Sequence, residues 1–233
     1  MNFPSPLLKG TLIKRYKRFL SDIELEDDTV VVAHCANSGS MMGLKEPGFE
    51  VWLSPSSNPK RKLKYTWELV NPGPSLVGIN TALPNKIVTE AIRDGHIPEL
   101  VGYGTLRNEV KYGENSRIDI LLEDGEKSPC YVEVKSVTLS RQAGIAEFPD
   151  AVTSRGTKHL NELSRMVELG QRAVMFYLVQ RSDCSSLRLA GDIDPAYAEA
   201  FSLARNKGVE VFCYGCDITN EKIEISVPIQ IVE

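Results

Sequence analysis

The stretch EVKYGENSRIDILLEDGEKSPCYVEVKSVTL, residues 109–139, decides how the larger part of this chain folds. Two runs in it, 116–123 and 130–138, show the two-residue alternation of β-strands, and a polar turn separates them. Successive side chains of a strand point to opposite faces, so we expect Asp119 to lie on the polar face of the first strand. The opposite face of that strand would carry the apolar side chains Ile118, Ile120 and Leu122.

Three charged side chains of these two strands are expected to converge. Glu133 and Lys135 share one face of the second strand, and because adjacent strands lie about 5 Å apart, Asp119 can reach the same point. Two carboxylates and one ammonium suit a hard divalent cation beside a phosphate, since oxygen ligands bind Mg²⁺ or Mn²⁺. We therefore predict Asp119 and Glu133 as metal ligands and Lys135 as a catalytic cation. The alternative is an ordinary solvated strand surface, where such charged pairs are common.

A further carboxylate and a cationic helix start would complete such a site. Glu90, on a helix predicted over 85–94, and Glu109 are competing candidates for the additional carboxylate. An apolar stripe ending at a glycine predicts a second helix over 155–169. Because helix N-termini attract phosphate, we predict that three residues near this start contact a phosphodiester backbone. They are Arg155, Lys158 and His159.

Composition limits the class of protein. The 233 residues carry a net charge of −4, with 42% hydrophobic and 25% charged residues, as is usual for a globular protein. No uninterrupted apolar run approaches 18 residues, so we expect no membrane span, and the first ten residues lack the pattern of a secretory signal. The five cysteines are odd in number and have no framework spacing, so we expect free thiols in a cytoplasmic protein.

The first 82 residues differ from the rest in charge and in pattern. They hold ten Lys and Arg against eight Asp and Glu, a charge of +2, which leaves −6 for residues 83–233. Short strands separated by turns, without a helical period, predict a small barrel here. Basic residues with interleaved aromatic rings are typical of surfaces that hold nucleic-acid strands, although Phe19 and Trp67 would serve equally as core residues. The basic residues form two clusters: Lys14, Arg15, Lys17 and Arg18, then Lys60, Arg61, Lys62 and Lys64.

From residue 83 onward the pattern changes to helices mixed with strands. The predicted order is helix, three strands, helix, strand, helix and two strands, which indicates a mixed α/β (α+β) domain. Cys213 and Cys216 form a lone CxxC pair, and one pair does not complete a tetrahedral zinc site.

Seven stretches spread over the whole chain resemble the sugar fermentation stimulation protein A family of bacteria and archaea. They are KRYKRFL (14–20), AHCANSGSMMG (33–43), KRKLKYTWELV (60–70), NTALPN (80–85), EVKYGENSRIDILL (109–122), YVEVKSVTL (131–139) and FPDAVTSRGTKHLNEL (148–163). The resemblance implies an N-terminal OB-type β-barrel, residues 1–82, and a C-terminal PD-(D/E)xK nuclease-like domain, residues 83–233. It places Asp119, Glu133 and Lys135 on the motif of that superfamily, with Ile118 where the motif has proline.

The resemblance also implies a function. The family is similar to non-sequence-specific DNA-binding proteins, with a regulatory link to sugar (maltose) metabolism. We therefore expect a cytoplasmic DNA-binding protein with a nuclease-like Mg²⁺ or Mn²⁺ site, without a membrane partner and with a homodimer as its assembly. Two alternatives stay open, a Mg²⁺- or Mn²⁺-dependent DNA endonuclease and a transcriptional regulator that acts through a protein partner.

Overall fold

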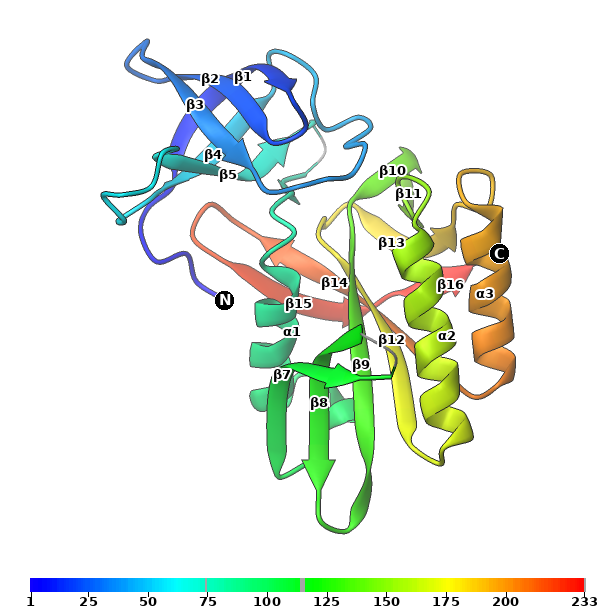
Figure 1. The fold of residues 1–233 in the computed structure, drawn as a ribbon. Coiled ribbons are helices and arrows are strands. Elements are labelled where there is room, and N and C mark those ends of the chain that lie inside the picture. The colour runs from blue at the N-terminus through cyan, green and yellow to red at the C-terminus, as the bar shows by residue number, and fades with distance from the viewer. Residues whose placement is uncertain (74, 114–115, 233) are drawn as a thin grey trace.

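The structure is a computed structural model that describes residues 1–73, 75–113 and 116–232. Figure 1 shows a small barrel above a larger domain, in which helices cover both faces of a sheet. The chain starts beside the larger domain, passes through the barrel and returns.

The first part of the chain is a barrel of short antiparallel strands. Its strands are β1 (Leu8–Tyr16), β2 (Leu20–Leu25), β3 (Val30–Cys35), β4 (Glu50–Pro55), β5 (Tyr65–Asn71) and β6 (Val77–Gly78). They follow the order β3-β2-β1-β4-β5-β6, and a parallel pairing of β3 with β5 closes the barrel. This confirms the predicted OB-type barrel.

The two aromatic residues considered for the barrel core have different positions. Trp67 is fully buried, and its indole N–H donates a hydrogen bond to the carbonyl of Leu69 at 2.8 Å. Phe19 is 44% exposed, and its ring stacks on His34. The core assignment therefore holds for Trp67 and is wrong for Phe19. Phe19 follows the tight turn between β1 and β2, where Lys17 and Arg18 have positive φ angles.

The larger domain contains two sheets and three α-helices among the described residues. Its main sheet has the order β15-β14-β12-β9-β8-β7, and a small sheet has the order β10-β11-β13-β16. The helices are α1 (Pro84–Arg93), the short 3-10 helix η1 (Pro98–Leu100), α2 (Ser154–Glu168) and α3 (Pro195–Asn206). The main-sheet strands are β7 (Thr105–Tyr112), β8 (Ser116–Asp124), β9 (Lys127–Val137), β12 (Arg172–Val179), β14 (Glu210–Ile218) and β15 (Ile223–Pro228). The small-sheet strands are β10 (Leu139–Gln142), β11 (Gly144–Phe148), β13 (Cys184–Leu189) and β16 (Gln230–Val232).

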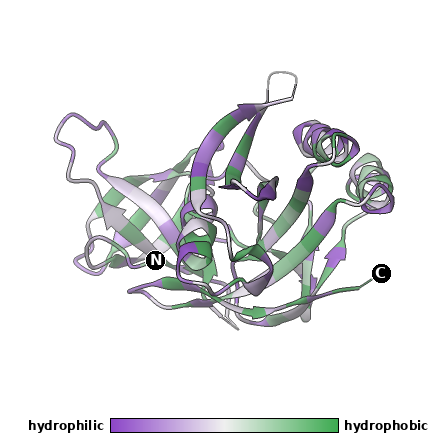
Figure 2. Ribbon diagram, turned by 90° about the horizontal axis from the view of Figure 1, so that it is seen from below, coloured by the Kyte–Doolittle hydropathy of each residue, from purple (hydrophilic) through white to green (hydrophobic). Residues whose placement is uncertain are grey.

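Two apolar layers hold the helices to the main sheet. Helix α1 packs with one face of the sheet through a core that includes Ile87, Val132 and Phe176. Helices α2 and α3 pack on the opposite face through a core that includes Leu160 and Tyr177. Figure 2 shows hydrophobic residues running along the strands of this sheet. The mixed α/β class predicted for this part of the chain is confirmed.

Two further expectations concern cysteines and membranes. All five cysteines are free and buried, as predicted. Among the described residues, no helix has the length and apolar character needed to cross a membrane.

Candidate functional site

The main sheet opens between β8 and β9 at the middle of β9. The two strands are paired from Leu122 with Cys130 to Ile120 with Val132, and no further pairing toward the start of β8 links their described residues. Strand β9 nevertheless stays paired with β12 as far as Val137. The carboxylate of Asp119 lies in the opening, where its Oδ2 accepts the backbone N–H of Val134 at 2.7 Å.

Asp119 also interrupts the alternation of its own strand. Ile118 and Leu121 lie in the core beneath α2, whereas Ile120 and Leu122 lie in the core beneath α1. The prediction that Ile118 shares a face with Ile120 and Leu122 is therefore wrong. Pairing of β8 with β9 stops at Ile120, whereas pairing of β8 with β7 continues to Ser116, and the side chain of Asp119 takes the N–H of Val134 on the unpaired side.

Helix α1 holds the other oxygen of Asp119. Asn85, in the first turn of α1, donates from its side-chain amide to Oδ1 of Asp119 at 2.8 Å. The same amide lies 3.4 Å from the carboxylate of Glu109, a residue of β7 with a φ of 55°. Burial raises the pKa of Asp119 to about 6 and the nearby Glu133 charge adds to this, against the opposing hydrogen bonds of Val134 and Asn85.

Glu133 is buried with a cation and a histidine on the same oxygen. Its Oε1 accepts a hydrogen bond from Lys135 Nζ at 2.7 Å and also bonds to Nδ1 of His159, from α2. Burial acts to raise the pKa of Glu133, but the hydrogen bond of His159 and the charge of Lys135 outweigh burial and lower that pKa. Its other oxygen, Oε2, is buried and has no hydrogen-bond partner within residues 1–73, 75–113 and 116–232.

The histidine is oriented from both sides of its ring. Nε2 of His159 accepts a hydrogen bond from Nε of Arg155 at 3.3 Å, which leaves Nδ1 as the donor to Glu133. His159 is only 5% exposed, so it does not contact a DNA backbone as predicted; its buried ring instead fixes a carboxylate. Arg155 and Lys158 lie exposed in the first turns of α2, so their predicted contact with phosphate stays a prediction.

The structure does not bring Glu90 to this site. Its carboxylate lies 3.2 Å from the amino group of Met1 and 3.8 Å from Lys86, and Met1 in turn bonds to Ile223 on β15. Strand β15 is the sheet edge farthest from β7 and β8 in strand order. Helix α1 therefore reaches Asp119 through Asn85 in its first turn, whereas Glu90 of the same helix holds the amino group of Met1.

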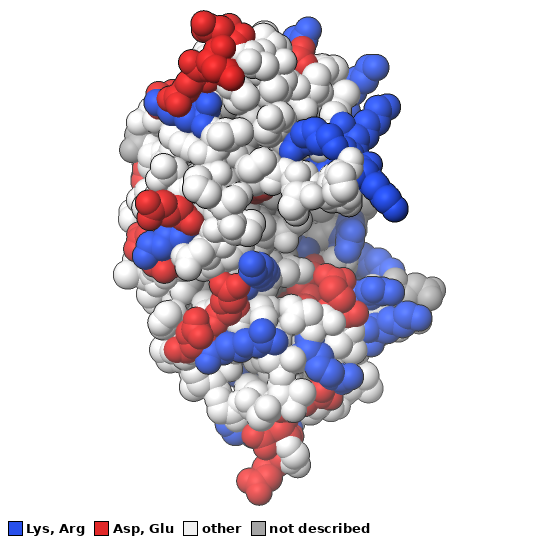
Figure 3. All heavy atoms as spheres, turned by 90° about the vertical axis from the view of Figure 1, so that its left-hand side faces the viewer, with Lys and Arg blue, Asp and Glu red and all other residues white. Residues whose placement is uncertain are grey.

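The basic residues of the barrel fall into structural and exposed groups. Arg15 donates to the carbonyls of Asn37 and Gly39 at 2.8 and 3.2 Å, and Arg61 donates to Thr66 Oγ1 at 2.8 Å. Lys14 lies 3.3 Å from Asp22. Figure 3 shows Lys and Arg side chains gathered over the barrel at its upper right, with acidic side chains at its top left.

The carboxylates of Asp119 and Glu133 supply only part of a cation's ligands. Among the described residues, no three His, Cys, Asp or Glu side chains form a ready ligand set. The buried Glu133, whose Oε2 has no hydrogen-bond partner among the described residues, and the half-buried Asp119 nevertheless fit Mg²⁺ or a similar ion, because such ions are held by one or two carboxylates together with water and substrate phosphates. The residues present thus fit a divalent cation whose remaining ligands come from outside the chain.

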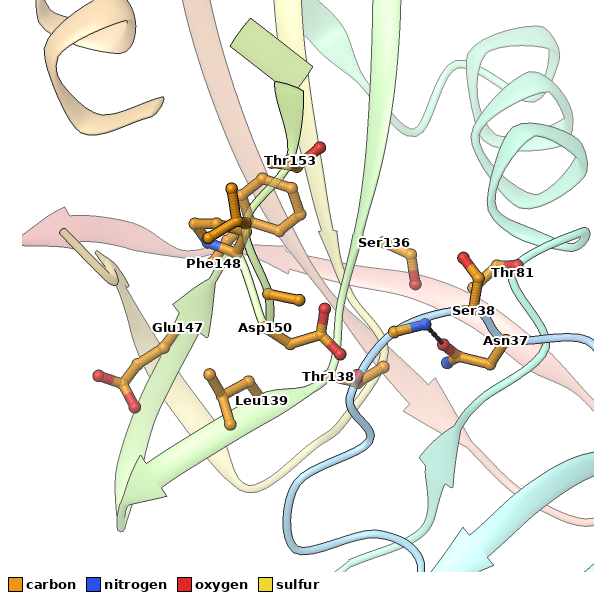
Figure 4. A pocket seen from close by; sticks show the side chains of 14 residues that line it. Asn37, Ser38, Thr81, Ser136, Thr138, Leu139, Glu147, Phe148, Asp150 and Thr153 are labelled. Atoms are coloured by element: carbon orange, nitrogen blue, oxygen red, sulfur yellow. Dashed lines mark hydrogen bonds between the residues drawn. The ribbon is translucent and has the colours of Figure 1, made fainter. Parts of the chain in front are cut away.

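Two features of the site were not predicted. Asn85 stands in the sequence beside Pro84 as an ordinary helix-start residue, and only the packing of α1 shows that it bonds to Asp119. The second feature is a cavity of about 240 Å³ between the barrel loop 37–39 and the start of α2. Figure 4 shows its polar lining, with Ser136 and Thr138 of β9 and its extension facing Asp150. No single stretch of sequence predicts it, because its walls come from both domains.

Comparisons with known proteins agree with this architecture. Residues 13–79 match the family described as the SfsA N-terminal OB domain, and residues 82–222 match the Sugar fermentation stimulation protein RE domain. The sugar fermentation stimulation protein homolog of Rhodospirillum centenum is 59% identical over 225 residues, covering 97% of both chains. The homolog of Paramagnetospirillum magneticum is 57% identical over 229 residues, covering 98% of this chain and 97% of its own.

A solved structure shows the same fold over the entire chain. The structure of Pyrococcus furiosus SfsA in complex with Ca²⁺ aligns with a TM-score of 0.90 and 26% identity, covering 100% of this chain and 98% of the other. The barrel, the mixed sheet and the family models are therefore mutually consistent, and the chain belongs to the sugar fermentation stimulation protein family.

Proposed function

We propose that this protein binds DNA without sequence specificity and hydrolyses phosphodiester bonds at a divalent-cation site formed by Asp119 and Glu133. The observation that carries the proposal is the buried Glu133, which lies in the same opening as Asp119. Its Oε1 accepts a hydrogen bond from Lys135, and its Oε2 has no hydrogen-bond partner among the described residues. The relative from Pyrococcus furiosus is described in complex with Ca²⁺, which supports a divalent cation in this fold.

Each residue of the site has a role in this proposal. A bound cation supplies Lewis-acid chemistry, lowering the pKa of a water molecule and offsetting charge on the phosphate. Lys135 offers an ammonium group, held at 2.7 Å from Glu133, to a phosphate oxygen. His159 and Asn85 orient the two carboxylates, and Arg155 extends the positive charge to the exposed start of α2.

The barrel supports binding rather than chemistry. Its exposed basic residues offer charge to the phosphate backbone, which gives a salt-dependent and sequence-tolerant affinity. Phosphate contacts alone carry no sequence information. The named link of the relatives to sugar fermentation, action through a protein partner, cytoplasmic location and a homodimer all stay predictions.

Cleavage assays on matched variants test this proposal. Wild type, Glu133→Gln and Lys135→Ala are incubated with plasmid, branched and single-stranded DNA in Mg²⁺, Mn²⁺ or EDTA. We expect cleavage only with metal, and at least about a hundredfold slower in both variants, because each loses a group at the reacting phosphate. Glu126→Gln, in an exposed turn, is the control and should cleave like wild type. Equal cleavage by all four proteins, or none with either metal, would contradict the proposed hydrolysis.

A further inference from the structure

The cavity beside the site is built by parts of the chain that lie far apart in sequence. Asn37, Ser38 and Gly39 come from the barrel, Ser136 and Thr138 from β9 and the residue after it, and residues 147–153 from the segment that leads into α2. Four of the seven stretches that carry the family resemblance contribute to its lining. The convergence of these separate stretches on one polar space indicates a binding site.

The electrostatics of the cavity differ from those of the neighbouring carboxylate site. None of its lining residues is Lys or Arg. Glu147, one of its two acidic residues, is neutralised by Arg141 and Arg188 at 2.8 and 2.9 Å. Asp150 therefore dominates, and its charge disfavours a phosphate inside the cavity and favours a group that donates hydrogen bonds.

The Asp150 carboxylate is available to such a group. Its Oδ2 accepts two long hydrogen bonds from the barrel, from Met41 N at 3.3 Å and Ser40 Oγ at 3.4 Å. The described residues give its Oδ1 no hydrogen bond. Figure 4 shows this carboxylate pointing into the space between Ser136, Thr138 and the loop of Asn37. A Cβ atom at Gly39 would collide with the carboxylate, so glycine allows the barrel loop to approach it.

The cavity adjoins the start of α2, because Thr153 in its lining caps this helix, which carries Arg155 and His159. Ser136 follows Lys135 directly on β9 and points to the opposite side of the strand, where its hydroxyl accepts from Gln180 at 2.8 Å. A ligand that spans both places needs a charged phosphate at Lys135 and a donor group at Asp150. A nucleic-acid strand provides both a phosphate and a base with donor groups, whereas a free sugar provides only the donor groups.

The volume limits what enters. About 240 Å³ corresponds to roughly eight water molecules, below the range of drug-sized pockets. One base with part of its sugar therefore fits, and two stacked nucleotides do not. A base enters such a pocket only after leaving its stack, at a cost that is smallest for unpaired or mismatched positions.

We propose that this cavity takes one unpaired nucleoside of the bound DNA strand and that Asp150 recognises guanine through its adjacent N1–H and N2–H donors. Among the described residues Oδ1 of Asp150 has no hydrogen bond and Oδ2 has only the two long ones, so both oxygens still offer acceptor lone pairs side by side. Guanine is the base that presents two neighbouring donors on its Watson–Crick edge. The proposal rests on the proposed DNA binding and adds a base preference to it.

Fluorescence anisotropy with two oligonucleotides tests this recognition. Both are short thymidine-rich single strands, one with a single central guanine and the other with inosine, which lacks the 2-amino donor. We expect wild type in EDTA to bind the guanine strand about tenfold more tightly, the effect of one hydrogen bond to a charged group. In Asp150→Asn the ratio should fall to about one while affinity for the inosine strand is unchanged. Asp217→Asn, at an exposed position of β14, is the control and should keep the wild-type ratio.

A second variant separates recognition from folding. Asp150→Asn also changes the oxygen that accepts two hydrogen bonds from the barrel, so Gly39→Ala tests the same contact with the carboxylate retained but displaced. It should lose the guanine preference as well. A ratio near one in wild type, or an unchanged ratio in both variants, would overturn the recognition of guanine while leaving DNA binding intact. Failure of wild type to bind either strand at low salt would overturn both proposals.

Discussion

His159 sets the ionisation of the buried carboxylate at the centre of the site. Without its hydrogen bond, burial would raise the pKa of Glu133, and protons would compete with the cation for this carboxylate. We therefore expect His159→Ala to weaken Mn²⁺ binding more at pH 6 than at pH 8, as measured by isothermal titration calorimetry. His96→Ala, which changes an exposed histidine, should bind as wild type does at both values. An equal loss at both pH values would refute this role of His159.

Glu147 gives the fold a separate dependence on acid. The hydrogen bond of Arg141 lowers the pKa of Glu147 to about 2, with Arg188 acting in the same direction and burial opposing them. Because the folded-state pKa lies below the unfolded value, the stabilisation is complete above about pH 4.5 and is lost as the pH falls toward 2. It amounts to about 3 kcal/mol at most.

Thermal unfolding of Glu147→Gln checks this contribution. We expect the variant to melt well below wild type at pH 7 and the difference to shrink at pH 3, since wild type then loses part of the same stabilisation. Asp217→Asn provides a control at an exposed carboxylate. A difference that stays constant between pH 7 and pH 3 would show that the ion pairs contribute nothing to acid sensitivity.

Where the strand geometry is regular, the local sequence pattern was sufficient to predict which side chains lie close together. The proximity of Glu133 and Lys135 follows from their two-residue spacing on one strand, and the structure places their charged groups 2.7 Å apart. Glu90 and Asn85 both lie on α1, and their spacing along the helix does not show which of them meets Asp119. That choice depends on how α1 packs across the sheet, which is information from outside the helix.

The starts of α2 and α3 are joined by one buried side chain. Thr153 caps α2 by accepting from Gly156 N at 3.0 Å, and Asp194 caps α3 by accepting from Tyr197 N at 3.0 Å. Asp194 also accepts the backbone N–H of Thr153 at 2.7 Å and is only 3% exposed. Its removal therefore leaves two backbone donors without partners, whereas removal of the Thr153 hydroxyl leaves one.

Urea unfolding of cap variants measures this difference. We expect Thr153→Ala to cost about 1 kcal/mol and Asp194→Ala about 2 to 3 kcal/mol of unfolding free energy. Asp194→Asn keeps an acceptor oxygen for only one of the two bonds and should lie between wild type and Asp194→Ala. If Asp194→Ala costs no more than Thr153→Ala, the bond between the helix starts adds no stability.

The elements predicted correctly from the sequence are those with a distinct hydrophobic pattern within their own residues. Helix α2 has an apolar stripe and a glycine stop, and β12 is a continuous buried run. The small sheet was not predicted, because β10 has only four residues, LSRQ, and β11 and β13 gain their partners from distant parts of the chain. These strands form through the parallel pairing of β11 with β13, which no local window of sequence contains.

The proposed DNA binding would involve the whole molecule, and its response to salt reports which phosphate contacts the barrel makes. Each lost phosphate contact reduces the slope of log affinity against log salt concentration by about 0.7 to 0.9. We expect Lys60→Glu/Lys62→Glu, at two exposed positions, to weaken binding strongly and to reduce the slope by about 1.4 to 1.8, the effect of two contacts, measured with duplex or single-stranded DNA at several salt concentrations. The matched control, Arg205→Glu/Lys207→Glu, makes the same charge change on α3 and should leave the slope unchanged. Equal slopes in both double variants would place the DNA elsewhere.

The first residues of the chain lie against the larger domain before the barrel begins. The amino group of Met1 bonds to Ile223 and Glu90, and Phe3 N donates to Glu221 at 2.9 Å. The barrel therefore connects to the larger domain at both of its ends, through the leading segment that contacts β15 and through the segment that continues into α1. A protease cut after the barrel, within residues 71–75, would produce two fragments that still co-elute on gel filtration, because the leading segment would keep the barrel tethered.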